Sequence, residues 1–347
     1  MKSRNYGIDL LKSVSMLMIV VLHVLGVGGV LAAAGEGGLS SNFAWALEAA
    51  NICAVNCFGL ISGYALSRGH YRRSRLLSLW LRVVLEGLLV TLAFLLLVPG
   101  SVGTKEWLNA VSPVIHNVYW YFTAYFCLFF FVPYINKMLA VLSKRALCAM
   151  ALSIFLLFSI INNASGNDIF SLHSGYSFLW LLSLYLMGAF LRSCEIRESL
   201  NKFWLLLAFA ALVALTWFGK MVLGLEGALS YTSPSVVLSA AALLLFFRRL
   251  EIKSKFGQKA ISMLSRTSFG VYIIHTQPLV WTYVLAQRFA PYASLPVPLM
   301  LAAVVLTAAT IYAAGTLIDW LAEKFFKLIR IDVLEAAVDG IGKAKLP

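Results

Sequence analysis

The sequence contains few charged residues. Only 12% of its 347 residues are Asp, Glu, Lys or Arg, against about 25% in a typical soluble domain. Hydrophobic residues make up 61% of the chain, and a soluble core of that composition would leave too little polar surface to face water. The composition therefore excludes an ordinary soluble domain. It predicts a polytopic membrane protein, because lipid removes the need for a polar surface.

Cysteine and histidine are also scarce, with five residues of each. The cysteines lie in or beside apolar segments and form no CxxC pair, which argues against a disulfide framework and against a zinc site. The histidines in the predicted loops show no spacing that is typical of metal ligands. The sequence also lacks an internal repeat, a low-complexity stretch and a linker. We therefore expect neither a bound metal nor a second folded domain.

Ten apolar runs are long enough to cross a bilayer, which takes about 20 helical residues. They lie near residues 8–30, 43–67, 75–98, 118–140, 145–162, 175–192, 202–220, 231–250, 266–287 and 294–321. The first run carries Asp9 and Lys12 near its start and lacks a cleavage site, so it is expected to be a span and not a signal peptide. The expected fold is all-α, with an integral-membrane domain over 1–330 and a short tail over 331–347.

The basic residues alternate with the predicted spans. Of the 28 Lys and Arg residues, only Lys105, Lys220 and Arg288 fall on one predicted side of the membrane. The others belong to the opposite side, which the positive-inside rule makes cytoplasmic, so both termini and the tail are expected there. The net charge of +13 is thus explained by topology and by contact with lipid headgroups, and it does not indicate nucleic-acid binding.

The first span carries two polar residues on one face. Lys12 and His23 are eleven residues apart, which corresponds to about three turns and about 16 Å along the helix axis. An ionisable residue as deep in the bilayer as His23 indicates a functional site, although histidine also serves as a hydrogen-bonding residue between helices. Glu48 in the second span is expected at a similar depth, where its carboxylate would orient the imidazole. The alternative is that Glu48 lies at the outer interface in contact with water.

Five motifs follow one another in a recognisable order. "IDLLKSVSMLMIVVLHV" carries Lys12 and His23, and "FGLISGYALS" follows; "YRRSR" then supplies an Arg-x-x-Arg pair at Arg72 and Arg75. "YWYFTAYFCLFFFVPYIN" and "SFGVYIIHTQPL" complete the series. Together they resemble the acyltransferase-3 family of integral-membrane acyltransferases over nearly the whole chain. Two departures from the family pattern are a lysine at position 12 in place of the usual arginine, which changes the geometry of phosphate contacts, and Asn56 where many relatives have proline.

The resemblance implies an acyl-CoA-dependent O-acyltransferase in the bacterial plasma membrane. Such an enzyme takes an acyl group, commonly acetyl, from cytoplasmic acyl-CoA. It transfers the group to a hydroxyl of a cell-envelope polysaccharide or glycoconjugate on the far side. The phosphates of CoA are then expected at Lys12, Arg72 and Arg75, because guanidinium and ammonium groups bind phosphate oxygens.

The resemblance also implies roles inside the membrane. The thioester arm of the donor is expected to pass Ser62, Tyr121 and His275. His23, oriented by Glu48, is expected either to remove the proton of the acceptor hydroxyl or to be acylated itself. Ser62 also fits a small-residue packing contact, and His275 a hydrogen bond to a neighbouring helix.

A solute transporter is the alternative class of protein. Ten helices with buried His23, Glu48 and Glu86 also suit a substrate or proton path. The absence of an inverted repeat in the sequence argues against this alternative.

Overall fold

The computed structural model describes residues 4–69, 71–72, 74–193 and 201–328. Within these ranges the chain forms helices and irregular segments and no β-strand. The predicted all-α class is therefore confirmed. The boundary at residue 330 and the predicted tail over 331–347 lie outside the described residues.

In the described ranges, eight helical segments are long and apolar enough to cross a membrane. They are α1 (Tyr6–Leu25), α3 with α4 (Leu39–Asn51 and Ala54–Leu66), α5 (Ser74–Leu97), α7 (Trp120–Val141), α8 with the π-helix η1 and α9 (Lys144–Ile154, Phe155–Ile161 and Asn162–Ala164), α11 (Lys202–Met221), η3 with α12 (Glu226–Leu229 and Pro234–Phe247), and α15 (Val297–Leu328). Eight of the ten predicted spans correspond to these segments.

The other two predicted spans are shorter or interrupted. The run at 175–192 forms α10 (Phe178–Ser193), an apolar helix of 16 residues. The run at 266–287 forms the second half of α13 (Lys255–Thr276) and is then broken at Pro278, which has no backbone N–H to continue the helix. The shorter elements are α2 (Val30–Ala34), α6 (Thr104–Val111), η2 (His173–Gly175), α14 (Pro278–Val280), the π-helix η4 (Trp281–Leu285) and η5 (Ala290–Ser294).

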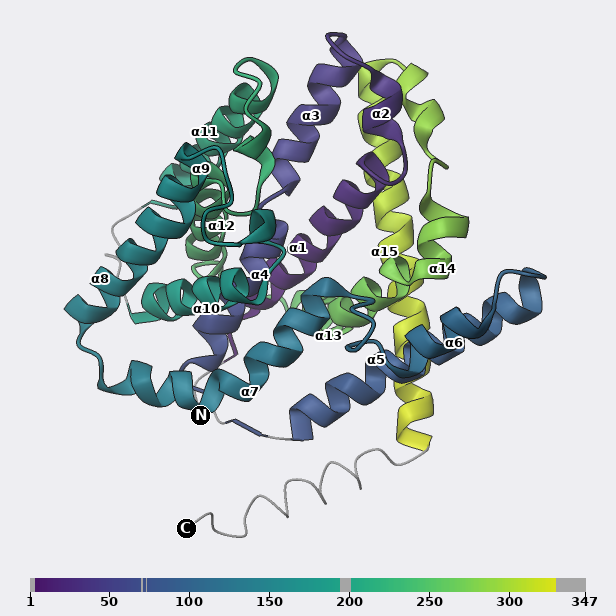
Figure 1. The fold of residues 1–347 in the computed structure, drawn as a ribbon, viewed down its shortest axis with the longest axis horizontal. Coiled ribbons are helices and arrows are strands. Elements are labelled where there is room, and N and C mark those ends of the chain that lie inside the picture. The colour runs from purple at the N-terminus through teal and green to yellow at the C-terminus, as the bar shows by residue number, and fades with distance from the viewer. Residues whose placement is uncertain (1–3, 70, 73, 194–200, 329–347) are drawn as a thin grey trace.

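Helix α1 is the central element of the bundle. Asn5 caps its N-terminus, since the side-chain oxygen of Asn5 accepts a hydrogen bond of 3.1 Å from the backbone N–H of Ile8. Most side chains of α1 are buried, and it contacts α3, α4, α12, α13 and α15. Figure 1 shows α1 passing through the middle of the bundle with α15 close by.

Helices α1 and α13 run parallel, so that residues at equal depth meet. Ser265 donates to the carboxylate of Asp9 at the start of α1, and His275 contacts His23 near its end. The polar residues of α13 therefore reach the same level as the polar face of α1.

Helices α4 and α10 approach closely enough to require glycine. A Cβ atom on Gly63 would overlap the backbone of Tyr185, and one on Gly188 would overlap the backbone of Leu60. Small residues that let two helix backbones approach closely are typical of helix packing in membrane proteins.

The chain turns back into the bundle after α5. Helix α6 returns alongside α5, and the two helices lie side by side in Figure 1. Ala110 of α6 packs against Gly87, which lies about halfway along α5. Helix α7 therefore begins inside the bundle, and its first residues, Trp120 and Tyr121, reach the interior cavity.

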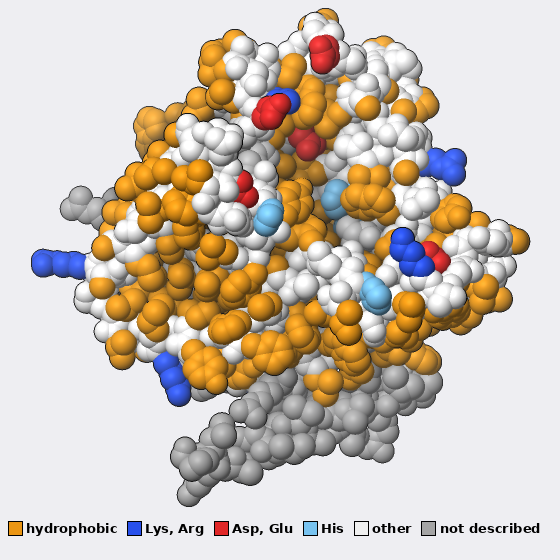
Figure 2. Space-filling view, in the orientation of Figure 1, with side chains coloured by type: hydrophobic (Ala, Val, Ile, Leu, Met, Phe, Trp, Pro, Cys, Tyr) orange, Lys and Arg blue, Asp and Glu red, His pale blue; other side chains and the backbone are white. Residues whose placement is uncertain are grey.

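Large apolar side chains cover the outer surface of the bundle. Leu96, Leu97, Phe203 and Trp204 are each more than half exposed. Figure 2 shows hydrophobic side chains over much of one face and a hollow between the helices, with acidic and histidine side chains visible inside it. A surface this apolar suits contact with lipid.

Candidate active site

A cavity of about 670 Å³ lies inside the bundle beside α1. Its size falls within the range of roughly 300–1,000 Å³ typical of small-molecule sites. Five of the eight predicted site residues line it, namely Lys12, His23, Glu48, Ser62 and Tyr121. Lys12 and His23 therefore face the same space, as their helical spacing predicts.

His23 forms a hydrogen-bonded pair with His275. Nδ1 of His23 lies 2.9 Å from Nε2 of His275, and Nδ1 of His275 lies 2.5 Å from the carbonyl oxygen of Val271 one turn earlier in α13. The ring of Trp281 packs edge-on against His23, with 4.8 Å between the ring centroids. Of the two histidines, His23 lines the cavity and His275 is fully enclosed behind it.

The hydrogen bonds of this pair fix the tautomers of two neutral rings. The carbonyl oxygen of Val271 has no proton, so Nδ1 of His275 donates to it. Nε2 of His275 is then unprotonated and accepts from Nδ1–H of His23. Nε2 of His23 is left with a free lone pair, which is the form of imidazole that accepts a proton or attacks a carbonyl.

Glu48 lines the same cavity but does not pair with His23. In the described part of the chain, its Oε2 atom is buried without a hydrogen-bond partner, and its carboxylate lies near the phenol of Tyr231. The structure thus gives His23 a different partner from the predicted one, because the parallel packing of α1 and α13 brings His275 against the ring. Glu48 and His23 share the cavity as separate polar groups.

Lys12 marks the other end of the cavity. Its ammonium lies 3.7 Å from a carboxylate oxygen of Asp9, whose other oxygen pairs with Arg4 at 2.5 Å. Ser265 of α13 donates to Asp9 and also lines the cavity. Asp9 thus connects the two cations to α13, and Lys12 faces the cavity from a fixed position.

Arg72 and Arg75 lie outside the cavity. Both side chains are exposed, Arg72 before α5 and Arg75 in its first turn. Arg75 interacts electrostatically with Tyr125, which is a cavity residue. Arg75 is therefore within electrostatic range of a residue of the site, and neither arginine forms its wall.

Ser62, Tyr121 and Tyr125 form one side of the cavity. The Ser62 hydroxyl donates to the carbonyl of Phe58 at 2.9 Å and interacts with both phenols. Tyr125 follows Tyr121 by one helical turn, and their rings stack with centroids 6.5 Å apart. Sequence reasoning missed Tyr125, although the spacing of four residues from Tyr121 could have indicated it.

Three aromatic residues line the cavity together with Glu48. Trp120, Tyr176 and Tyr231 all line it, and their rings contact one another. Tyr176 and Tyr231 lie in the loops before α10 and α12. Sequence reasoning missed both residues, because an irregular loop has no periodicity that would indicate which side chains turn inward.

A second polar cluster lies between α5 and α15, apart from the cavity. Arg82 donates to Glu86 at 2.9 Å and to Asp319. Both carboxylates are buried, and Oε2 of Glu86 and Oδ2 of Asp319 have no hydrogen-bond partner among the described residues. None of the three residues lines the cavity.

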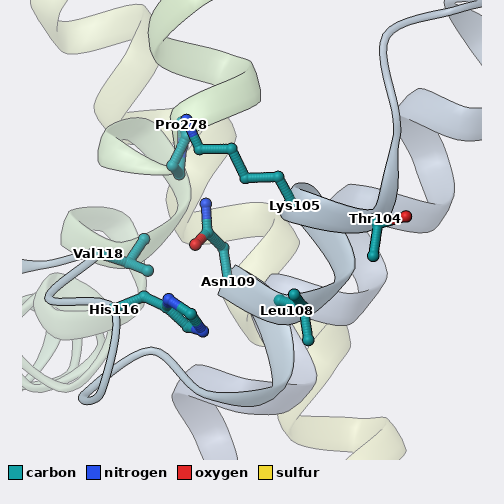
Figure 3. A pocket seen from close by; sticks show the side chains of 7 residues that line it. All are labelled: Thr104, Lys105, Leu108, Asn109, His116, Val118 and Pro278. Carbon is teal, nitrogen blue, oxygen red and sulfur yellow. The ribbon is translucent and has the colours of Figure 1, made fainter.

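A separate pocket of about 400 Å³ lies behind the turn between α13 and α14. Figure 3 shows Lys105 and Asn109 of α6 and His116 of the following loop around this pocket, with Pro278 beside them. The pocket shares no lining residue with the main cavity. Of the other loop histidines, His173 lines neither space, and His70 lies outside the described residues.

The described residues contain no cluster of three or more His, Cys, Asp and Glu side chains that could hold a metal ion. The chemical groups that face the cavity are an imidazole, a carboxylate, an ammonium group, hydroxyls and aromatic rings. These groups suit acid–base chemistry or transfer through a nucleophile.

A bundle of apolar helices around a cavity with a histidine and a carboxylate defines an integral-membrane protein with an internal chemical site. The family model of an acyltransferase domain, that of the acyltransferase-3 family, matches residues 5–318. The chain belongs to this family and is a membrane acyltransferase. No curated protein and no solved structure matches it.

Proposed function

We propose that the protein is an O-acyltransferase that uses cytoplasmic acyl-CoA, with acetyl-CoA as the principal donor. It moves the acyl group through the membrane to a hydroxyl of an extracytoplasmic cell-envelope polysaccharide or glycoconjugate. The observation that carries this proposal is the single cavity that Lys12 and His23 line together. A cation and an imidazole about 16 Å apart along one helix suit a donor with an anionic head and a distant thioester.

The proposed topology has ten spans and both termini in the cytoplasm of the bacterial plasma membrane. The eight long apolar helices support it, with α10 and the α13–η4 segment as the remaining two. The distribution of Lys and Arg supports the orientation. The Lys12 end of the cavity then faces the cytoplasm, and the aromatic end faces outward.

The donor binds with its phosphates at the cytoplasmic end. Lys12 contacts them from inside the cavity, and Arg72 and Arg75 contact them from the exposed segment at the start of α5. The pantetheine arm extends along Ser62 and Tyr121, which form the side of the cavity. Its thioester then reaches His23.

His23 acts on the acceptor hydroxyl. Nε2 of His23 takes the hydroxyl proton while the oxygen forms a bond to the thioester carbonyl carbon, and the C–S bond then breaks. The proton on Nε2 passes to the departing CoA sulfur, so that an ester and CoA thiol are formed without net proton uptake. His275 accepts from Nδ1–H throughout, and Glu48 lies on the acceptor side of the cavity.

A covalent route uses the same residues in two steps. Nε2 of His23 attacks the thioester carbonyl carbon, the C–S bond breaks, and CoA leaves as the thiolate. The acceptor oxygen then attacks the acyl carbon, the bond between the acyl group and Nε2 breaks, and the hydroxyl proton goes to the CoA thiolate. Rapid acid quenching after mixing with radiolabelled acetyl-CoA separates the routes. Label on a peptide that contains His23 indicates the acyl carrier, and its absence during turnover indicates direct transfer.

The test of the proposed function uses the purified full-length protein in lipid nanodiscs. We expect CoA binding by calorimetry and release of CoA thiol from acetyl-CoA. His23→Ala should lower the release rate by about 10²–10⁴-fold, the range for loss of a general base, while CoA affinity stays within about twofold. His116→Ala, which alters a residue outside the cavity, serves as the matched control.

Two results would overturn the proposal. A wild-type protein that binds no CoA is not an acyl-CoA-dependent enzyme. Movement of a solute across the membrane of sealed vesicles without CoA would support the alternative, a transporter. Among the described features, only the buried polar residues favour a transporter.

A further inference from the structure

The aromatic end of the cavity is a compact wall. Trp120 and Tyr176 have ring centroids 4.7 Å apart, Tyr176 and Tyr231 4.9 Å, and Trp120 and Tyr231 6.1 Å with only 20° between their planes. The two tyrosine hydroxyls lie 3.4 Å from each other. We call these three residues the aromatic wall. Their rings are too close together to enclose a ligand, so a ligand would lie against the wall.

The aromatic wall is held from behind by a buried amide. Asn56 of α4 is fully buried. Its Nδ2 donates to the carbonyl of Tyr231 at 2.7 Å, and its Oδ1 accepts from the indole N–H of Trp180 at 3.1 Å. A Cβ atom on Gly175 would overlap Tyr231 and crowd Trp180, so the chain needs glycine there. The position of Tyr231 is therefore fixed by groups that do not themselves reach the cavity.

The loop that carries Tyr176 is strained. Ser171, His173 and Ser174 all have φ angles between 50° and 55°, in the left-handed region that non-glycine residues seldom occupy. The carboxylate of Asp168 accepts from the N–H groups of Leu172 and His173 at 2.7 and 2.6 Å and holds this conformation. Backbone strain of this kind gathers at functional sites.

The same loop is tied to the neighbouring segment. The carbonyl of Ser174 accepts from the N–H of Tyr231 at 3.1 Å and from the Ser230 hydroxyl at 3.0 Å. Two loops that are far apart in the sequence thus form one rigid support for Tyr176 and Tyr231.

Charge beside the aromatic wall is of one sign. Among the described residues that line the cavity, the charged side chains are Lys12 and Glu48. Lys12 lies about three turns of α1 away from His23, whereas Glu48 lines the cavity within electrostatic range of Tyr231. Glu48 lines the cavity, and its Oε2 atom has no hydrogen-bond partner among the described residues, so the side chain can accept a hydrogen bond from a ligand on the side that faces the cavity.

We infer that the aromatic wall and Glu48 form the acceptor subsite, and that this subsite selects an uncharged sugar residue over an acidic one. The inference rests on the proposed function and names its acceptor class. The apolar face of a pyranose ring lies on the aromatic wall, and one of its hydroxyls donates to Glu48. A uronate or sialate would have to bury its own carboxylate beside the Glu48 side chain, and the aromatic wall has no cation to balance that charge.

The test compares two matched acceptors with the purified protein and acetyl-CoA. Methyl glucoside and methyl glucuronoside differ only in the carboxylate, and both are assayed for transfer and for binding by saturation-transfer NMR. We expect kcat/KM for the glucoside to exceed that for the glucuronoside by at least about tenfold, the factor that corresponds to about 1.4 kcal/mol. Equal use of both sugars, or preference for the glucuronoside, would overturn the inference.

Variants of the aromatic wall separate acceptor binding from donor binding. Trp120→Ala and Tyr231→Ala should raise the acceptor KM by about tenfold and leave the acetyl-CoA KM within about twofold. Trp204→Ala, at an exposed position on α11, is the matched control and should change neither constant. Glu48→Gln should bring the kcat/KM values for the glucoside and the glucuronoside closer together. Loss of a merely structural residue would not produce this effect.

Failure of this inference is distinguishable from failure of the proposed function. If acetyl-CoA is bound and cleaved but neither sugar binds, the acceptor subsite is wrong and the donor assignment stands. If His116→Ala raises the acceptor KM while Trp120→Ala does not, the acceptor binds in the pocket of Figure 3 and the inference is overturned. If CoA does not bind, the proposed function itself fails.

Discussion

Nδ1 of His23 lies 2.9 Å from Nε2 of His275, and the second ring is anchored to the carbonyl of Val271. This chain of two hydrogen bonds runs from the backbone of α13 to the imidazole of α1. A carbonyl oxygen can only accept a hydrogen bond, so in two neutral rings the protons must lie on Nδ1 of His275 and on Nδ1 of His23. His275 is therefore expected to act through His23 as a positioning residue, which corresponds to the expected hydrogen bond to a neighbouring helix and not to the alternative contact with the donor arm.

Replacement of His275 tests this role. In His275→Ala, Nδ1 of His23 loses its acceptor, so both tautomers become accessible and the imidazolium formed in the reaction loses its hydrogen-bond partner. We expect kcat for acyl transfer to fall by about 10²-fold, the lower end of the range for general-base catalysis. The acetyl-CoA KM should stay within about twofold. Steady-state kinetics with varied donor concentration measures both constants.

A conservative variant distinguishes positioning from packing. The amide oxygen of His275→Gln offers an acceptor for Nδ1–H of His23, so part of the lost kcat should return. Equal rates in the Ala and Gln variants would mean that His275 only fills space, and an increased acetyl-CoA KM would favour the predicted contact with the donor.

The sequence predicts the parts of the site that lie on regular helices. The spacing of Lys12 and His23 places them on one face, and both line the cavity. Glu48 and Ser62 also reach the cavity from the second predicted span. Helical periodicity suffices for these residues because their directions follow from the backbone alone.

Residues that depend on tertiary contacts could not be predicted in this way. The pairing of His23 with His275 depends on the parallel packing of α1 and α13, which no local pattern contains. Tyr176 turns inward because of a strained loop held by Asp168. Pro278 in the sequence indicates that the predicted span 266–287 is interrupted. Where the segment after the break lies in the fold depends on packing.

Removal of the Lys12 ammonium should weaken donor binding. Lys12 faces the cavity but shares its charge with Asp9, 3.7 Å away. We expect Lys12→Ala to raise the acetyl-CoA KM by about fivefold to tenfold, which corresponds to about 1–1.4 kcal/mol for one charge-assisted contact. Lys12→Arg should retain most of the affinity. Calorimetry with CoA provides an independent measurement.

The matched control for Lys12 is Lys253→Ala, which removes an exposed cation from the loop before α13. It changes the net charge by the same amount but does not touch the cavity. A similar loss of CoA affinity in both variants would show that general surface charge, and not a contact inside the cavity, attracts the donor.

The buried charge cluster of Arg82, Glu86 and Asp319 links α5 to α15, which both pack against α13, and should contribute strongly to the stability of this region. Arg82→Ala leaves two buried carboxylates without a cation, which is expected to destabilise the protein by about 3–5 kcal/mol. Glu86→Gln should cost less, because Asp319 still balances Arg82 and Oε2 of Glu86 has no hydrogen-bond partner within the described ranges. Thermal unfolding in one detergent, followed by circular dichroism, ranks the variants.

A surface ion pair gives the reference for this ranking. Arg266 lies 3.5 Å from Glu323, and its side chain is 55% exposed, so Arg266→Ala should cost less than about 1 kcal/mol. If Arg82→Ala is no more destabilising than Arg266→Ala, the buried cluster does not hold the two helices together.

The crossing of α4 and α10 should not tolerate a methyl group. In Gly188→Ala the new Cβ would overlap the carbonyl of Leu60. Because the opposing atoms belong to a helix backbone, the two helices have to move apart. Overpacking of this kind typically costs about 1–3 kcal/mol, and the melting temperature in detergent should fall accordingly.

Gly69→Ala is the control, since its Cβ would meet only ordinary contacts of 3.5–3.6 Å. Because α4 also carries Ser62 and Asn56, separation of the helices should raise the KM for both the donor and the acceptor. If the Gly188→Ala variant is destabilised but its kinetic constants are unchanged, the crossing of α4 and α10 does not position the residues of the cavity.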